Sequence, residues 1–249
     1  MGRYATYWCG EIPVMSYQKF AYYYDSLMDE DFYSGYLHFI MNNAIFETVL
    51  ELGCGTGIMA IELSKLNKTV YATDLSKQML EVAKMNATEA NVDLMLGKID
   101  MCDFIINEPV DLILCMCDSL NYILTPNKVL KVFQNVFNAL KEDGTFIFDV
   151  HSLHKINVTF EDYVEEAEDD DFYFKWTVRK IAEGKIRHHV QIVDQENHDR
   201  VDERHEQQTY PVETYVDLLK KAGFNNIHYY SDFKEYDEQD DRVIFVVKK

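Results

Sequence analysis

The stretch TVLELGCGTGIMAIEL, residues 48–63, is the most informative part of the chain, because it holds three of the ten glycines within five positions. A short apolar run, 48–52, precedes the glycines and has the length and composition of a β-strand. An amphipathic run, 57–66, follows them with the period of an α-helix. Glycines at such a turn let a ligand contact backbone N–H groups beside the positive end of the helix dipole. The stretch therefore predicts a ligand site, with a simple tight turn as the alternative.

The spacing of these glycines separates two classes of nucleotide-binding protein. Dinucleotide-binding enzymes carry G-x-G-x-x-G, in which the last glycine makes room for the pyrophosphate and for close helix packing. Here the spacing is G-x-G-x-G, at Gly53, Gly55 and Gly57, and Ile58 occupies the position of the third dinucleotide glycine. The Lys-Ser/Thr pair of a P-loop is also missing from the stretch. An NAD-dependent oxidoreductase is therefore the weaker alternative.

Strand-like and helix-like runs alternate over most of the chain. Helical runs separate the first strands, and another helical run, 16–46, precedes them. The expected strands are 48–52, 69–75, 92–100, 111–117, 145–150, 226–233 and 241–249. The alternation is typical of a parallel sheet with helices on both faces. We expect an α/β fold with a doubly wound, mostly parallel, seven-stranded sheet.

Residues 155–210 have a different pattern. Two alternating runs around the turn AEGK (182–185) and a third, more polar run predict antiparallel strands with one packed and one wet face. We interpret 155–210 as a small inserted antiparallel β subdomain in a domain made of 1–154 and 211–249. The aromatic stripe Phe172, Phe174 and Trp176 is interpreted as core. Residues 161–171 hold eight acids in eleven positions and fit a solvated loop or a lid that attracts a cationic amine.

Composition limits the partners. The formal net charge is −19, so the surface should repel nucleic acid and anionic lipid and suit small neutral or cationic molecules. No run of eighteen apolar residues and no secretory start are present, which argues against a membrane helix and secretion. The five cysteines are scattered without a CxxC pair, so we expect no metal site and free thiols in a reducing cytoplasm. The sequence does not indicate an oligomeric state.

Carboxylates follow the next two strands, at the sheet edge where ligands bind. Asp74 ends the second strand and could accept hydrogen bonds from both hydroxyls of a ribose. It could instead cap the following helix, but Ser76 is available for that role. Asp100 and Met101 end the third strand, where a carboxylate and a backbone N–H could contact an adenine ring. Alone, Asp100 reads equally well as a solvated loop acid.

These motifs, taken together, resemble those of a known family. The segments VLELGCGTG, VYATDLS, GKIDMCDF, DLILCMCDSLNYI and LKEDGTFIFDV resemble the successive motifs of class I S-adenosylmethionine-dependent methyltransferases, which have a Rossmann-like fold. The segments YQKFAYYYDSLM, CDSLNYI, FDVHS and HEQQTYPVETY resemble bacterial small-molecule methyltransferases related to the deoxysugar-amine N-methyltransferases. One departure is Gln208, where the group's pattern carries Arg.

The resemblance implies a binding site for S-adenosyl-L-methionine. In it, Glu51 and the backbone around Cys117 lie near the methionine amino group, and Asp74 holds the ribose. Leu75 lies beside the adenine, and two N-terminal tyrosines cover the cofactor. The residues that the resemblance assigns to the cofactor are Tyr17, Tyr24, Glu51, Gly53, Cys54, Gly55, Asp74, Leu75, Asp100, Met101 and Cys117.

The chemistry asks for few protein groups. The cofactor's methyl group is already electrophilic, so the protein must align a nucleophile and exclude water. A base is needed only if the nucleophile arrives protonated, and His151, after the fifth strand, is the best candidate by position. Its alternative is a loop histidine bonded to backbone, and His188 on an apolar strand face is interpreted as packed. The expected substrate contacts are Asp118, Asn121, Tyr122 and His205.

These observations favour a cytoplasmic methyltransferase that acts on an oxygen or nitrogen atom of an unidentified small molecule. The fourth strand does not end in the Asn/Asp-Pro-Pro-Tyr/Phe signature of enzymes that methylate nucleobase amines or planar amides. The alternative is a non-catalytic protein that binds S-adenosylmethionine or an adenine nucleotide as an effector.

Overall fold

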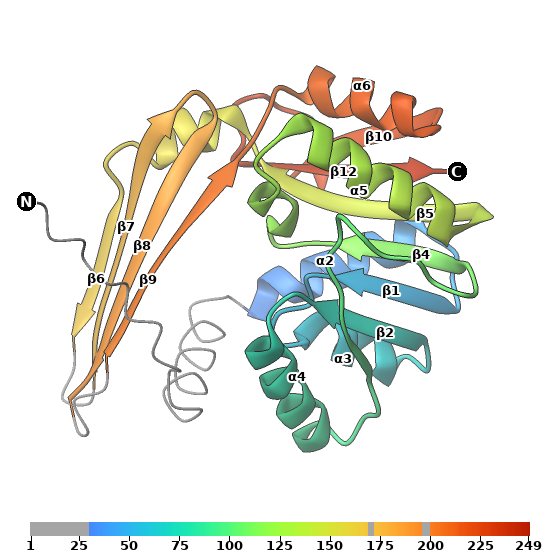
Figure 1. Cartoon of the computed structure of the whole chain (residues 1–249), viewed down its shortest axis with the longest axis horizontal. Coiled ribbons are helices and arrows are strands. Elements are labelled where there is room, and N and C mark those ends of the chain that lie inside the picture. Colours follow the sequence, from blue (N-terminus) through green and yellow to red (C-terminus); the bar gives the residue numbers. More distant parts are fainter. Residues whose placement is uncertain (1–29, 169–171, 196–199) are drawn as a thin grey trace, which may run out of the picture.

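The computed structural model describes residues 30–168, 172–195 and 200–249, so the predicted cofactor contacts Tyr17 and Tyr24 lie outside the described residues. Two sheets make up the fold (Figure 1). The first has the strand order β11-β10-β12-β5-β4-β1-β2-β3. Its strands are β1 Thr48–Leu52, β2 Thr69–Asp74, β3 Met95–Lys98, β4 Val110–Cys115, β5 Leu140–His151, β10 Asn226–Ser231, β11 Lys234–Glu235 and β12 Arg242–Lys248.

The first sheet is mostly parallel, as expected. Strands β1 to β5 pair in parallel, while β12 pairs antiparallel with both β5 and β10. It has eight strands instead of the predicted seven, because β11 is only two residues long and leaves no periodic signal. In Figure 1 the arrows of β1, β2 and β4 point toward the second sheet, so the carboxyl ends of the parallel strands face it.

Helices cover both faces of the first sheet. On one face lie α5 Pro126–Ala139 and α6 Val212–Ala222; on the other lie α2 Glu30–Asn43 and α3 Ile58–Lys65, with α4 Lys77–Glu89 beside α3. The buried stripe of α5 includes Val129, Val132 and Phe133, as its periodicity predicts. The sequence predicts that this helix ends near Gly144, but it ends at Ala139 because Leu140 already has extended backbone and starts β5. The described helices include none that is long and apolar enough to cross a membrane.

Strand β4, apart from Asp111, is apolar because both of its faces are covered. Leu112 and Leu114 pack under α2 and α3, whereas Ile113 and Cys115 pack under α5 and α6. A strand covered on both faces has no solvent side, so its sequence does not alternate.

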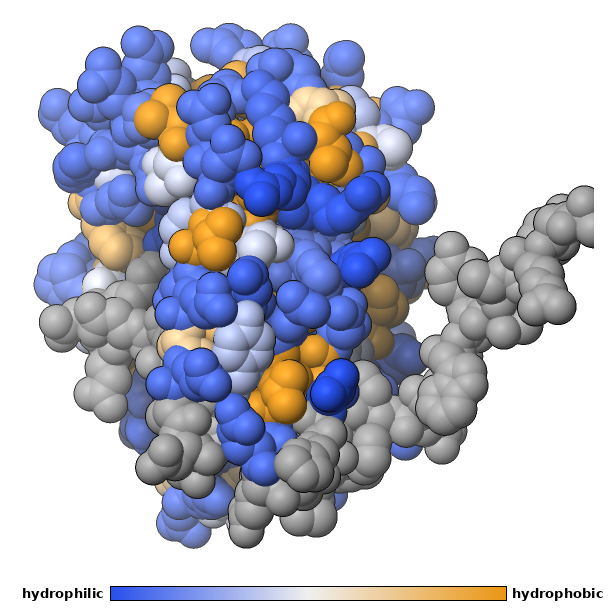
Figure 2. Space-filling model, turned by 90° about the vertical axis from the view of Figure 1, so that its left-hand side faces the viewer, coloured by the Kyte–Doolittle hydropathy of each residue, from blue (hydrophilic) through white to orange (hydrophobic). Residues whose placement is uncertain are grey.

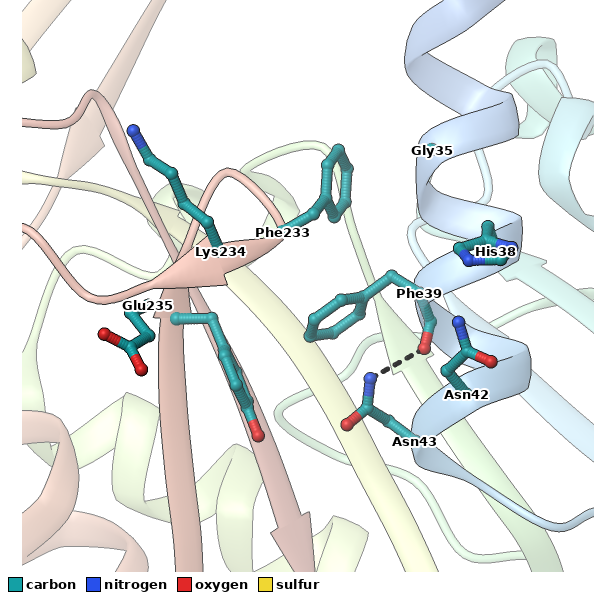
Figure 3. Close-up of a pocket in the computed structure, with 9 residues that line it drawn as sticks. Gly35, His38, Phe39, Asn42, Asn43, Phe233, Lys234 and Glu235 are labelled. Atoms are coloured by element: carbon teal, nitrogen blue, oxygen red, sulfur yellow. Dashed lines mark hydrogen bonds between the residues drawn. The ribbon is translucent and has the colours of Figure 1, made fainter.

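Helix α2 is held against the end of the sheet by aromatic side chains (Figure 3). Phe39 packs against Tyr230 of β10 at 5.3 Å between ring centroids and against Phe233 at 5.7 Å. A side cavity of about 430 Å³ lies between them, and the Asn43 amide donates to the Phe39 carbonyl at 2.8 Å. This packing fixes the position of α2, whose first turn carries Tyr33 to the main cavity described below.

The second sheet has the order β6-β7-β8-β9, from β6 Val164–Glu168, β7 Phe172–Ala182, β8 Lys185–Asp194 and β9 Arg200–Gln208. The predicted turn between β7 and β8 is confirmed, with Gly184 at φ 62°. The outer face is largely hydrophilic, as Figure 2 shows for this side of the molecule. It carries ion pairs such as Arg187–Glu206. One packed and one wet face were expected from the alternation.

The acidic segment 161–171 is not an irregular loop throughout. Residues 164–168 form the edge strand β6, which pairs antiparallel with β7. Glu166 accepts from the Tyr173 hydroxyl at 2.8 Å and from Lys175 at 3.2 Å. For residues 164–168 the prediction of a loop is wrong, since they form a strand. Glu165 of this strand lines the main cavity, and the alternative of a lid that attracts a cationic amine stays a prediction. Charged side chains on an edge strand also hinder pairing with another chain.

Candidate functional site

A cavity of about 820 Å³ lies between the carboxyl ends of the parallel strands and the inner face of the second sheet. This is the edge at which open α/β sheets bind ligands. All but one of the predicted site residues within the described chain line it: Glu51, Gly53, Cys54, Gly55, Asp74, Leu75, Asp100, Met101, Cys117, Asp118, Tyr122, His151 and His205. The exception is Asn121.

Side chains are absent at the three glycine positions for different structural reasons. All three adopt left-handed backbone, with φ of 72° at Gly53, 54° at Gly55 and 83° at Gly57. A Cβ at Gly53 would lie 2.7 Å from the Ser119 hydroxyl oxygen, and one at Gly57 would lie 3.0 Å from Ala83. A Cβ at Gly55 would meet nothing within 4 Å. Internal packing therefore excludes side chains at two positions, and only Gly55 presents bare backbone to open space.

Asp74 closes the glycine turn from the end of β2. Its carboxylate accepts from the Gly55 N–H at 3.0 Å and from the Ser76 N–H at 2.7 Å. Ser76 caps α4, as expected, by accepting from the Met79 N–H at 3.3 Å. Asp74 is thus engaged with backbone, but each carboxylate oxygen keeps a further lone pair that can accept from a ligand hydroxyl.

Glu51, in β1, has a carboxyl group with a shifted pKa close to the glycine turn. Its side chain is 4% exposed, and within the described chain Oε2 has no hydrogen-bond partner. Burial, followed by the nearby Asp74 carboxylate, raises the pKa of Glu51 to about 8. A buried carboxyl group beside a second carboxylate is stabilised when a positive charge binds next to it. This end of the cavity therefore suits a cationic ligand.

The end of β3 supplies a more exposed wall. Asp100 is exposed and accepts from the Cys102 N–H at 2.8 Å, so it closes its own turn while lining the cavity. The Met101 carbonyl accepts from the Asn135 amide at 3.2 Å, which anchors this loop to α5. Leu75 is 62% exposed, which leaves its side chain free to cover a flat ring.

The turn after β4 is held by a buried ion pair that the sequence analysis missed. Cys117 and Asp118 both adopt left-handed backbone, at φ 54° and 53°. The Asp118 N–H donates to both oxygens of Asp149, at 3.3 and 3.2 Å, and Arg242 lies 3.2 Å from the same carboxylate. Asp149 is completely buried. Its one sequence signal is an acid in the otherwise apolar strand TFIFDV.

The prediction that Asn121 contacts substrate is not supported by its position. Asn121 is 0% exposed and does not line the cavity. Its amide nitrogen donates to the Gln208 carbonyl at 2.8 Å, and its amide oxygen accepts from the His151 N–H at 2.9 Å. The 3₁₀ turn Ser119–Tyr122 rotates Asn121 inward while Tyr122 faces the cavity. Asn121 therefore joins β5 to β9.

The inner face of the second sheet forms the opposite wall. Phe174 and Trp176 pack in core clusters as predicted, but they also line the cavity, so the interpretation as core alone is corrected. Because strand side chains alternate, Gln207 faces the cavity whereas Gln208 turns to the β7–β8 turn. There the Gln208 amide donates to the Glu183 and Thr209 carbonyls. Gln208 is not among the lining residues, so the missing Arg at this position does not bear on the cavity wall.

Stacked rings lie along this wall. The prediction that His188 is packed and satisfied is confirmed, since one ring nitrogen lies 3.0 Å from the Trp176 indole nitrogen and the other 2.8 Å from the Gln207 amide oxygen. His188 stacks on Trp176 at 5.7 Å and on His205 at 4.9 Å between centroids, and His205 lies 5.5 Å from the Tyr122 ring. Burial, and then His205, lower the pKa of His188 to about 4.

His151 is buried at the junction of the two walls. Its Nε2 lies 3.0 Å from the Gln207 amide oxygen and 3.6 Å from Asp118. Burial lowers the pKa of His151 to about 4 against the opposing pull of Asp118, so the ring is neutral near pH 7. Burial alone would raise the pKa of Asp118, but His151, the Gln207 N–H, Lys155 and Arg242 together lower it. The site therefore pairs a neutral imidazole with an ionised carboxylate.

Comparisons with known proteins agree with this geometry. Residues 49–144 match the family model of a methyltransferase domain. YqeM of Bacillus subtilis (strain 168), which is named as a candidate methyltransferase, is 34% identical over 242 residues, covering 94% of this chain and 98% of the relative. The chain belongs to the S-adenosylmethionine-dependent methyltransferases, and S-adenosyl-L-methionine is its cofactor.

Two solved structures support this assignment at different levels. An S-adenosylmethionine-dependent methyltransferase from Clostridium acetobutylicum ATCC 824 is 30% identical, with a TM-score of 0.83, over 94% of this chain and 98% of its own. The sugar N-methyltransferase KedS8 from Streptoalloteichus sp. ATCC 53650 is 19% identical, with a TM-score of 0.74, over 100% of this chain and 98% of its own. At that identity the second likeness shows the shared fold alone.

Proposed function

We propose that this cytoplasmic enzyme transfers the methyl group of S-adenosyl-L-methionine to a nitrogen or oxygen atom of a small molecule held between the two sheets. The single observation that carries the proposal is the cavity itself. On one side it has the glycine turn and the buried carboxyl group of Glu51, which suit a cation, and on the other side it has the stacked rings of the second sheet. In this proposal residues 1–154 and 211–249 form the cofactor domain, and the insert 155–210 supplies the acceptor wall. The free thiols of the described cysteines support a reducing compartment.

The residues at the glycine turn fit the cofactor. Gly55 offers a backbone approach that a Cβ would fill, and Asp74 beside it can accept from ribose hydroxyls. Glu51 offers an unpartnered buried oxygen to the amino end. Leu75 and Met101 lie where an adenine ring could be covered. When bound, the cofactor supplies an electrophilic methyl group.

The opposite wall favours a cationic or hydroxyl-rich acceptor. Glu203 faces the cavity from β9, no hydrogen bond or ion pair joins it to another described residue, and burial raises its pKa. Its neighbours on this wall include Val190 and Ile192, which offer no hydrogen bonds. The adjoining histidines are uncharged near neutral pH, so they do not repel a cation. KedS8, which shares the fold, is described as acting on a sugar nitrogen, and this supports a nitrogen acceptor.

The chain's own residues have three tasks in this reaction. The two walls exclude water and orient the acceptor, which by alignment alone can contribute several kcal/mol, of the order of 7–11 in favourable cases. Tyr122 and His205 lie where they can contact the acceptor. His151, as a neutral ring, can take a proton from an acceptor that arrives protonated.

Replacing Asp74 with alanine is expected to weaken cofactor binding at least tenfold. The substitution removes charge-assisted hydrogen bonds to ribose, each contributing about 1.5–3 kcal/mol, and it releases the Gly55 N–H. Calorimetric titration with S-adenosylhomocysteine measures the effect. Asp93→Ala, which changes an exposed acid before β3, is the matched control and should bind normally. Unchanged affinity of Asp74→Ala would mean that another carboxylate holds the ribose.

The acceptor is tested with methyl-labelled cofactor and a metabolite extract separated into cationic, neutral and anionic fractions. We expect labelled product from the cationic fraction, and a loss of at least tenfold in Glu203→Gln, since a hydrogen bond to a charged group contributes about 1.5–3 kcal/mol. Glu206→Gln is the control, because Glu206 pairs with Lys185 and Arg187 on the outer face. Cofactor binding without labelled product in any fraction would favour a non-catalytic binding protein.

A further inference from the structure

The side chain of Gln207 is the hub of a buried polar network that joins both sheets. Its amide nitrogen donates to Asp118 at 2.5 Å, while its amide oxygen lies 3.0 Å from His151 Nε2 and 2.8 Å from His188 Nε2. Gln207 is 2% exposed, so these protein groups replace water as its partners. Hydrogen bonds in such a buried network are stronger than the same bonds in water.

The proton positions in this network follow from the chemistry of the partners. An ionised carboxylate accepts only, so the amide nitrogen of Gln207 must face Asp118 and the amide oxygen must face the two rings. An amide oxygen also accepts only. His151 and His188 must therefore each carry a proton on Nε2 to make their bonds.

An independent contact gives the same answer for His188. The indole nitrogen of Trp176 lies 3.0 Å from His188 Nδ1, and an indole N–H can only donate. His188 Nδ1 must therefore be without a proton, which leaves a neutral ring protonated at Nε2. The two arguments start from different residues and require the same tautomer.

For His151, a proton on Nε2 determines the state of the other ring nitrogen, Nδ1. With its proton on Nε2, the ring has an unprotonated Nδ1, and Nδ1 is a buried atom without a hydrogen-bond partner in the described chain. We infer that Gln207 is a positioning residue that holds His151 in the Nε2-protonated tautomer, which leaves Nδ1 as the one nitrogen of this ring that can accept a proton. The role of Nδ1 as proton acceptor rests on the proposed methyl transfer; the tautomer does not.

The charged groups around the two rings come from every packed element. Asp118 from the turn after β4, Lys155 from the π-helical turn Lys155–Thr159 and Arg242 from β12 act on His151. His205 from β9, Asp118 and His151 act on His188. A glutamate in place of Gln207 would place its carboxyl group against Asp118, so the two groups would share one proton. The glutamate oxygen that faces the rings would then carry part of the negative charge and would favour their protonated forms.

The test is ¹⁵N NMR of the histidine rings in the labelled full chain. Each ring signal is assigned with a variant in which one histidine is replaced. In the wild type we expect His151 and His188 to carry the proton on Nε2 and to stay neutral from about pH 5.5 upward. In Gln207→Glu, an isosteric change, the titration midpoint of at least one ring should rise by a pH unit or more.

Gln191→Glu is the matched control, because Gln191 makes the same kind of amide contact on the wet face of the second sheet. It should leave both ring titrations unchanged. A wild-type His151 that carries its proton on Nδ1 would overturn the inference, and so would unchanged ring titrations in Gln207→Glu. If that variant does not fold, the wild-type tautomer alone decides. Failure of methyl transfer would leave the tautomer result standing, so the two failures are distinguishable.

Discussion

Replacing Arg242 with methionine should lower the melting temperature of the chain by roughly 6–20 °C. Asp149 is completely buried, and Arg242 is its ion-pair partner at 3.2 Å. Removing one partner of a buried pair typically costs about 3–5 kcal/mol, because the other charge is left uncompensated. One kcal/mol corresponds to about 2–4 °C for a chain of this size. The turn at Cys117 and Asp118, which Asp149 holds, should loosen as well.

The loss should depend on pH. Burial raises the pKa of Asp149 to about 6 even with Arg242 present, and without Arg242 that pKa should rise further. Below about pH 6 the carboxyl group is protonated and needs no partner, so the difference in melting temperature should be smaller at pH 5 than at pH 8. Arg204→Met, at an exposed ion pair, is the control and should change stability by less than about 1 kcal/mol. An equal loss in both variants would contradict a buried pair.

Glu51→Gln should lower affinity for S-adenosylhomocysteine by roughly ten- to a hundredfold. The variant keeps the shape of the side chain but cannot supply a negative charge to the cofactor's ammonium group, and a charged hydrogen bond contributes about 1.5–3 kcal/mol. With a pKa of about 8 in the free protein, Glu51 must release a proton when the cation binds. Wild-type affinity should therefore rise between about pH 6 and pH 8 and then level off, while the variant stays flat. Calorimetry in buffers of different ionisation enthalpy measures the released proton directly.

The same substitution should act in the opposite direction on stability. A carboxyl group whose folded pKa is raised stabilises the fold below its unfolded pKa and loses that contribution as pH rises to about 8. Glutamine is neutral throughout, so the ligand-free variant should melt above the wild type near pH 8. Glu62→Gln, on the partly exposed side of α3, should show neither effect. Weaker binding together with lower stability would indicate a merely structural role for Glu51.

The sequence predicted which residues gather around the glycine turn, for identifiable reasons. Apolar runs with glycines between them mark parallel strands and their first turn, and the carboxyl ends of such strands meet at one edge. Asp74 and Asp100 could therefore be placed beside the glycines from the order of the residues alone, and the family resemblance added Glu51. Periodicity alone also predicted the packed His188.

The remaining errors of prediction share one physical cause. The periodicity of a sequence does not show which residues meet in the folded structure. Asn121 follows β4 directly, yet a 3₁₀ turn rotates it away from the cavity. Asp149 and Arg242 come from different strands and meet only through strand pairing, with Arg242 in register with His151. The acidic composition of 164–168 predicted a loop because the sequence does not show that β7 offers Tyr173 and Lys175 as partners. Gln207 gave no signal, because its importance lies in three partners far from it in the chain.

We propose that the carboxyl ends of the strands form one adenosyl-binding slot beside Gly55. A crystal structure of the chain grown with S-adenosylhomocysteine tests it most directly. We expect the ribose within hydrogen-bond distance of Asp74, the amino end of the ligand at Glu51, and the adenine between Leu75 and Met101. Density for the ligand elsewhere on the protein, or crystals that exclude it at saturating concentration, would contradict the account.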